Sequence, residues 1–210
     1  MTDVKPRRAS RSRLREEATL LGQKAVVDSA AALFTEQGYA RTTIDQIAAR
    51  AGVSRPTVFA VGSKAQLLAL ARQAAIGGDS VLGNELALAE ILAERDPAEL
   101  LRRFATLTSG IARRWAPLHG ALEEAAASDP ALAPLRQASR DEMYGCARHV
   151  VDALRSSGSL RGDLTAKAAA DMLSLLLEPR QYQQLVTERH WSHRGFTEWH
   201  ADTMIRLLLP

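Results

Sequence analysis

Residues 43–64 read TIDQIAARAGVSRPTVFAVGSK, and this stretch decides the fold of the N-terminal part of the chain. The Thr43 hydroxyl can cap a first helix, and Gln46 follows three residues later, where its side chain can reach back to the Thr43 backbone. Gly52 comes about two turns further on and can take the left-handed conformation with which a helix ends sharply. The stretch therefore begins with a short helix followed by a glycine turn.

A second short helix is predicted directly after this turn. Ser54 can cap it, and Pro56 falls in its first turn, where no backbone N–H is missed. Val58 and Phe59 would face inward, and the residues left pointing outward are Arg55, Pro56 and Thr57. Two short helices around such a turn are typical of a helix-turn-helix, which lays its second helix in the DNA major groove. A plain helical hairpin with no DNA role would have the same pattern.

Helix signals also flank the motif on both sides. Ser63 and Gln66 form a second capping box, so another helix begins at Ser63. Upstream, a helix that ends at Gly38 has one apolar face, made by Val26, Ala30, Leu33 and Phe34. The chain therefore begins with a three-helix unit and the start of a fourth helix.

Charge is concentrated at the N-terminus. Residues 1–17 hold six basic and three acidic side chains, and residues 1–64 carry a net charge of +5, against −2 for residues 65–210. A polyanion is therefore the expected partner of the first part. Residues 1–17 are predicted to be a basic flexible arm that contacts DNA through Arg7, Arg8 and Arg11. A disordered solubilising tail would have the same composition.

The block from Ala31 to Leu68 resembles the TetR (tetracycline-repressor-like) family of transcriptional regulators. It combines an apolar helix ending in Gly-Tyr, a Thr-Thr-Ile helix start, Ala-Gly-Val-Ser at the turn and Ser-Lys before the fourth helix. The resemblance implies an all-helical homodimer that binds a double-stranded DNA operator and a small-molecule effector. Its domains would be the arm (1–17), a helix-turn-helix DNA-binding domain (18–64) and a larger helical ligand-binding and dimerisation domain (65–210).

The resemblance also implies roles for single residues. Arg55 would be the bidentate guanine contact, with Pro56 and Thr57 beside it against the base edges. The remaining candidate DNA contacts are Thr42 and Thr43 on phosphate, Ser54 and Phe59 on the second motif helix, and Lys64 on phosphate.

One segment departs from the family pattern. The family usually has Tyr, one residue, Tyr or His, and Phe before the Ser-Lys pair, whereas here the run 59–64 is one residue shorter. Phe59 has no hydroxyl to give to a phosphate, and neither Ala60 nor Val61 replaces the second aromatic residue. The basic arm would compensate for these contacts. The alternative is a helical small-molecule or partner-binding protein whose DNA-binding domain has decayed.

The remainder of the chain is predicted to be helical, with a break at Gly77-Gly78. The expected helices lie near 63–77, 97–114, 117–127, 131–156, 164–188 and 195–208, with 86–93 either a short helix or part of a loop. The last two helices are the candidate dimer interface, broken or kinked at Pro179, although their apolar faces could equally complete the monomer core. The candidate cavity wall consists of Phe104, Trp115, Met143, Tyr144 and Met172, each of which could instead pack in the core.

Other functional classes find little support. Cys146 is the only cysteine, which suits the cytoplasm, and no uncharged apolar run is long enough to span a membrane. His190, His193 and His200 lie close in sequence but lack the supporting ligands of a metal site. There is no glycine-rich phosphate loop and no nucleophile elbow. We therefore expect a ligand-responsive repressor, with no enzymatic activity, no cofactor and no metal.

Overall fold

The structure is a computed structural model that describes residues 6–77 and 81–210, with side chains from 18 to 77 and from 84 onward. Helices make up the regular structure throughout these ranges, and no strand occurs within them, as the all-helical prediction requires. The chain divides into two compact units, Met1–Ala71 and Arg72–Pro210. The first unit therefore extends seven residues beyond the predicted boundary at residue 64.

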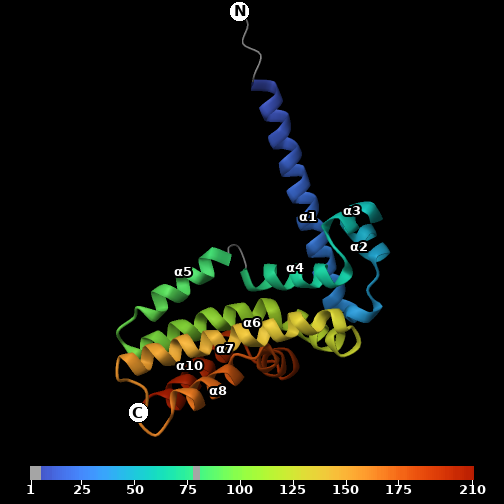
Figure 1. Ribbon diagram of the computed structural model, residues 1–210. Helices are drawn as coiled ribbons and strands as arrows, with labels where there is room; N and C mark the ends of the chain where they lie inside the picture. The colour runs from blue at the N-terminus through green and yellow to red at the C-terminus, as the bar shows by residue number, and fades with distance from the viewer. Residues whose placement is uncertain (1–5, 78–80) are drawn as a thin grey trace, which may run out of the picture. The chain divides into compact units, whose positions relative to one another are not determined.

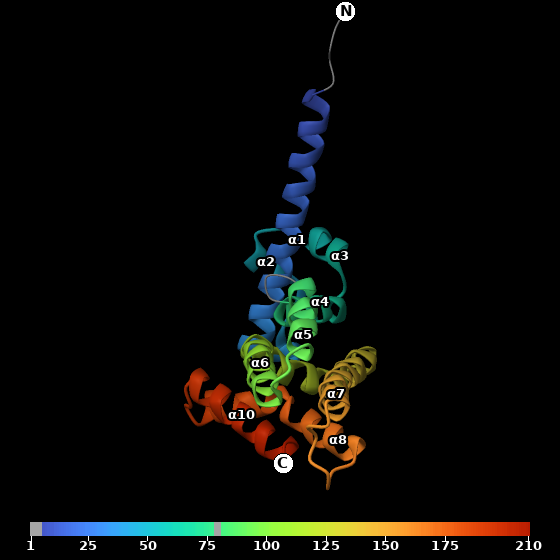
Figure 2. The same cartoon turned by 90° about the vertical axis from the view of Figure 1, so that its left-hand side faces the viewer.

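Unit 1 is a bundle of short helices around one long helix (Figures 1 and 2). Its elements are α1 (Pro6–Arg41), α2 (Ile44–Ala51), α3 (Arg55–Val61) and the first part of α4 (Lys64–Gly77). Gly38 interrupts α1 with φ of +81°, a conformation that favours glycine, so the predicted end of the helix at Gly38 is confirmed. The backbone of residues 6–17 is helical, so the segment predicted as a flexible arm is the first part of α1.

The core of unit 1 follows the predicted helix faces. Val26 and Phe34 of α1, Ile47 of α2 and Val58 of α3 are all buried. These side chains hold α2 and α3 against α1, which both helices contact. The predicted inward orientation of Phe59 is wrong, because Phe59 is 56% exposed and only Val58 turns to the core.

Unit 2 is larger and layered. It comprises the end of α4, then α5 (Val81–Leu92), α6 (Pro97–Ser128), η1 (Pro130–Leu132), α7 (Ala133–Ser156), α8 (Ala166–Leu176), α9 (Pro179–Tyr182), η2 (Gln183–Glu188) and α10 (His193–Leu208). Figure 2 shows α7 and α10 on opposite sides of α6, with α8 beside α7. Large buried side chains from four helices form its main core, namely Leu101, Phe104, Val150, Leu173 and Met204.

The long helix α6 replaces two predicted helices, 97–114 and 117–127. Pro117 lies inside α6 and removes one backbone donor, yet the helix continues because side chains on both sides of the proline are buried, including Trp115 and Leu118. The predicted helix 164–188 is instead divided into α8, α9 and the π-helical η2. The division falls just before Pro179, where a break or kink was expected.

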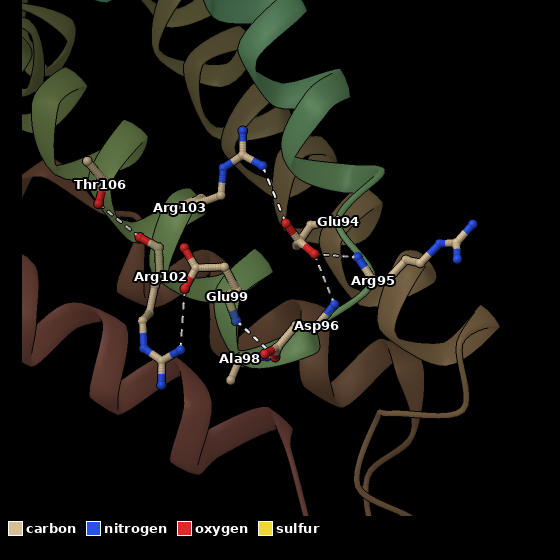
Figure 3. A network of polar contacts seen from close by, with 8 residues as sticks. All are labelled: Glu94, Arg95, Asp96, Ala98, Glu99, Arg102, Arg103 and Thr106. Atoms are coloured by element: carbon tan, nitrogen blue, oxygen red, sulfur yellow. Dashed lines mark hydrogen bonds and ion pairs between the residues drawn. The ribbon is translucent and has the colours of Figure 1, made fainter.

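Capping side chains determine where helix α6 begins. The Asp96 carboxylate accepts hydrogen bonds from the backbone N–H groups of Ala98 and Glu99, at 2.8 and 3.2 Å (Figure 3). The Glu94 carboxylate accepts from the N–H groups of Arg95 and Asp96, so the chain turns into the helix with its amides satisfied. The predicted Asp-Pro helix start is therefore confirmed.

Candidate DNA-binding surface and cavity

The first helix of the motif has both of its ends fixed by the predicted residues. The Thr43 hydroxyl accepts a hydrogen bond from the Gln46 N–H at 3.2 Å, and the Gln46 side-chain oxygen accepts from the Thr43 N–H at 2.9 Å. Gly52 ends α2 in the left-handed conformation, with φ of +67°, and its N–H points to the carbonyls of Ala48 and Ala49. The capping box and the glycine turn are both confirmed.

Helix α3 is capped in the same manner and presents a polar outer face. The Ser54 hydroxyl oxygen accepts from the Thr57 N–H at 3.3 Å, and the two hydroxyls are hydrogen-bonded to each other at 2.8 Å. Arg55, Pro56 and Thr57 are exposed, as predicted from the helix faces. This outer face therefore offers a guanidinium and two hydroxyls from one turn of helix.

An ion pair orients Arg55, which the sequence did not predict. Its Nε lies 2.9 Å from an Asp45 carboxylate oxygen, and the two side chains are 60% and 63% exposed. Asp45 stands in the first turn of α2, where an acidic residue also suits the helix dipole. The pair engages the Nε edge of Arg55. Only the packing of α3 on α2 brings these residues together, so sequence spacing gave no signal.

The connection between α1 and α2 is held by hydrogen bonds within unit 1. Thr42 is buried, and its hydroxyl donates to the Gly38 carbonyl at 2.8 Å. Lys64 Nζ donates to the carbonyls of Tyr39 and Thr42, at 2.9 and 3.0 Å, and lies 4.1 Å from the centre of the Tyr39 ring. The Thr42 side chain therefore has a structural contact inside unit 1, and its predicted phosphate contact stays a prediction. Thr43 is exposed, and its phosphate role stays a prediction, as does that of Lys64.

The shortened run before Lys64 closes as a tight turn. Gly62 is buried, and a Cβ added to it would lie 2.9 Å from the Gln66 Cβ, a distance that real side chains do not reach. Gln66 is held there by the second capping box, because its side-chain oxygen accepts from the Ser63 N–H at 2.8 Å. Arg7, Arg8 and Arg11 of the predicted arm lie on α1, and their side chains fall outside the described residues.

Unit 2 contains a cavity of about 150 Å³. Two of the five predicted wall residues, Trp115 and Met143, line it. Phe104 does not, because it is buried in the main core, and Tyr144 packs against that same core. Met172 is half-buried on α8, away from the cavity. The wall comes from α4, α6, α7 and the α8–α9 connection, and its other members include Arg72, Ile76, Thr108, Ile111, Ala112 and Leu177.

The sequence analysis missed two charged residues of this wall, Arg72 and Glu142. Arg72 is 9% exposed, and one terminal nitrogen lies 2.5 Å from a carboxylate oxygen of Glu142. The guanidinium lies 5.7 Å from the centre of the Trp115 ring, and Nε is buried without a hydrogen-bond partner. A signal did exist, because Arg72 is the only charged residue of α4 after Lys64. Burial, with a smaller effect of Glu142, raises the pKa of the neighbouring Cys146 thiol.

The clustered histidines have separate roles. His200 is buried, and its Nε2 donates to the Leu176 carbonyl at 3.0 Å, so its Nδ1 is the acceptor facing the Ser109 hydroxyl at 3.4 Å. Burial lowers the pKa of His200 to about 4. His193 instead pairs with the Tyr182 hydroxyl at 3.0 Å. Within the described ranges, no three His, Cys, Asp or Glu side chains gather closely enough to hold a metal ion.

A helix-turn-helix unit followed by a helical unit with its own cavity is an arrangement typical of helix-turn-helix transcription regulators. The family model described as bacterial regulatory proteins, tetR family, matches residues 26–71, which span the end of α1 through most of α4. The N-terminal unit of this chain therefore resembles the DNA-binding domain of TetR-family regulators. None of the curated protein sequences matches the chain. No helix in the part of the chain that the structure describes is long and apolar enough to cross a membrane.

Solved structures share the fold over most of the chain. The complex of SmeT with triclosan has a TM-score of 0.68 at 21% identity, covering 90% of this chain and 92% of that one. SmeT is the repressor of the Stenotrophomonas maltophilia multidrug efflux pump SmeDEF. A transcriptional regulator from Saccharomonospora viridis in complex with choline has a TM-score of 0.70 at 21% identity, covering 90% and 97%. A gamma-butyrolactone receptor gives 0.65 at 18% identity, covering 92% and 90%.

Proposed function

We propose that the protein is a ligand-responsive repressor that binds a palindromic operator as a homodimer and leaves it when a small molecule binds unit 2. The observation that carries this proposal is the outer face of α3. Arg55 extends from it beside Asp45, and the Thr57 hydroxyl is held by Ser54. Because an arginine can give two parallel hydrogen bonds to guanine, this face is suited to reading base edges in the major groove.

Charge and exposed apolar side chains support the DNA-bound dimer. Residues 1–64 carry a net charge of +5, which favours a polyanion, and the predicted arm contributes +3 of it. Two large apolar side chains near the C-terminal end are exposed, Leu175 of α8 at 63% and Trp191, just before α10, at 40%. We infer that α8 and α10 form the dimer interface, because burial of such side chains between two copies stabilises an assembly. A dimer would present two α3 helices to two half-sites.

The cavity supports control by a small molecule. Two proteins with this fold, SmeT and the S. viridis regulator, have been solved with triclosan and with choline. In this chain, α4 begins at Lys64 in unit 1 and carries Arg72 and Ile76 of the cavity wall in unit 2. A ligand would shift the DNA-binding equilibrium only by its preference for one of two conformations of the protein.

The other candidate function is a small-molecule or partner-binding protein whose DNA-binding unit has decayed. The tight turn at Gly62 and the exposed Phe59 favour this alternative, because Phe59 has no hydroxyl for a phosphate. A decayed unit would bind DNA weakly and with little salt dependence, whereas neutralisation of several phosphates gives a steep dependence.

Selection of bound sequences from a random duplex library, with purified protein at moderate salt, tests the proposal. The expected result is an inverted repeat. Arg55→Ala should then weaken binding to the selected site by about 1–3 kcal/mol and leave non-specific binding nearly unchanged. Arg50→Ala is the matched control, because Arg50 is also an exposed, ion-paired arginine of the motif but pairs with Glu36 of α1. Recovery of no sequence above background would favour the decayed alternative.

A further inference from the structure

The cavity of unit 2 combines an apolar wall with one buried cation. Ile76, Ile111 and Leu177 supply aliphatic surface, and Trp115 supplies an aromatic ring. Among the residues that the structure describes, Arg72 is the only basic one in this wall, and it is nine-tenths buried. A guanidinium stays charged at every physiological pH, so its burial must be offset by groups that accept its hydrogen bonds.

The contacts of Arg72 offset this burial only in part. Its one ion-pair partner, Glu142, is 60% exposed, so water weakens their attraction. The Arg72 Nε is buried and has no hydrogen-bond partner among the described residues, and an unmade bond of a buried donor is costly. An acceptor brought into the cavity could pair with the Arg72 guanidinium, while the Glu142 carboxylate is already exposed enough to return to water.

The volume of the cavity limits what can enter. About 150 Å³ is the volume of an apolar cavity known to hold one benzene molecule in another protein. The part of an occupant that lies inside the cavity is therefore about the size of a single ring with a small substituent. A cationic group would lie beside Arg72 and be repelled, whereas an anionic acceptor makes hydrogen bonds roughly twice as strong as a neutral one.

We propose that this cavity binds compact single-ring carboxylic acids, with the ring against Ile111, Trp115 and Leu177 and the carboxylate on the Arg72 guanidinium. The carboxylate accepts hydrogen bonds from the Arg72 guanidinium and takes over part of the role of Glu142. This ligand class rests on the proposed function where the ligand is also taken to be the effector that releases DNA.

Calorimetric titration of the full chain, without DNA, tests the ligand class. Benzoate is the probe, and benzamide is its uncharged counterpart of nearly the same shape. We expect benzoate to bind at least tenfold more tightly at neutral pH. Arg72→Gln should weaken benzoate binding at least tenfold and leave benzamide binding within twofold of the original protein. Arg113→Gln, at an exposed arginine on the same helix as Trp115, should change neither ligand.

Several results would overturn the ligand class. These are failure of benzoate to bind at millimolar concentration, equal affinity for benzoate and benzamide, or an equal effect of Arg72→Gln on both ligands. If Arg72→Gln does not fold, Ala112→Leu serves as a second variant, because Ala112 lines the cavity and added methyl groups would fill it. This variant should lose both ligands, and retained benzoate binding would place the acid elsewhere.

Operator release is measured separately, which keeps the two proposals distinguishable. If benzoate binds as described but leaves the protein on its selected DNA, the ligand class stands and the effector role in the proposed function fails. If no operator is found, the proposed function fails, while the calorimetric comparison still decides the ligand class.

Discussion

The helix-turn-helix of unit 1 and the cavity of unit 2 are built in different ways. In unit 1 the decisive contacts join residues three positions apart, as Thr43 with Gln46 and Ser63 with Gln66. In unit 2 the cavity gathers α4, α6, α7 and the α8–α9 connection, and its charged pair joins Arg72 to Glu142 across 70 positions. Local contacts therefore specify the motif, whereas the cavity exists only after distant helices have packed together.

The largest expected effect tests the dependence of unit 2 on packing. Leu101 is fully buried in its main core, so Leu101→Ala should lower the free energy of unfolding by about 2–5 kcal/mol. Tryptophan fluorescence during urea unfolding measures this, because Trp115, Trp191 and Trp199 all lie in unit 2. Leu86→Ala, at a 57% exposed position, is the control and should have little effect. If Leu101→Ala lowers the free energy of unfolding by less than 1 kcal/mol, unit 2 does not depend on the packing of distant helices as described.

The next effect concerns a buried histidine that connects distant helices. The pKa of His200 is lowered to about 4 from an ordinary value of 6.5. Between pH 6.5 and pH 4, His200 binds a proton in the unfolded chain but stays neutral in the folded protein. Stability should therefore be unaffected by His200 above pH 7 and should fall as the pH drops from about 6.5 to 4, by about 3 kcal/mol in total.

Urea unfolding at pH 7 and at pH 5, followed by tryptophan fluorescence, measures the contribution of His200. His200→Gln retains a side-chain amide that can donate to the Leu176 carbonyl but does not titrate. The variant should lose less stability than the original protein over this pH interval. If both proteins lose the same amount, His200 is not the group responsible.

A smaller effect is expected at the tight turn of unit 1. Gly62→Ala would press a methyl group onto the Gln66 Cβ and should lower stability by about 1–3 kcal/mol. Gly22→Ala is the matched control, because Gly22 lies inside α1 with open space around it and should gain about 0.5–1 kcal/mol. Circular dichroism at 222 nm follows both variants. If Gly62→Ala leaves the stability unchanged, the shortened run accommodates the added methyl group at little cost.

The smallest effect tests a single cap. Thr43→Ala removes the hydroxyl that accepts from the Gln46 N–H, which should cost about 0.5–2 kcal/mol, whereas Thr43→Ser keeps the oxygen and most of the stability. Because unit 1 has no tryptophan, circular dichroism should detect the loss while the fluorescence transition of unit 2 stays in place. A shift of both signals by the same amount would mean that the two units unfold as one.

The motif was predictable because its hydrogen bonds are local. Thr43, Gly52 and Ser54 were each assigned from neighbouring residues, and the structure confirms all three as cap or turn residues. The errors in unit 1 arose at tertiary contacts. Phe59 is exposed because α3 turns only Val58 to the core, and the Asp45–Arg55 pair depends on how α3 packs on α2.

Unit 2 was less predictable for the same physical reason. Its helices were largely foreseen, but α6 continues through Pro117 because packing on both sides offsets one lost hydrogen bond. An apolar side chain on an amphipathic helix can face either the core or a cavity, and the sequence gives no means to choose. Trp115 therefore lines the cavity while Phe104, on the same helix, fills the core.

The single cysteine gives the cavity a built-in chemical reporter. Cys146 lines the wall beside Glu142, and its raised pKa leaves little of the reactive thiolate at neutral pH. Alkylating reagents should therefore modify the protein slowly and at one place only, and any occupant of the cavity should slow them further. The rate of that reaction in the unaltered chain would report occupancy without a tag, a fluorophore or a substitution.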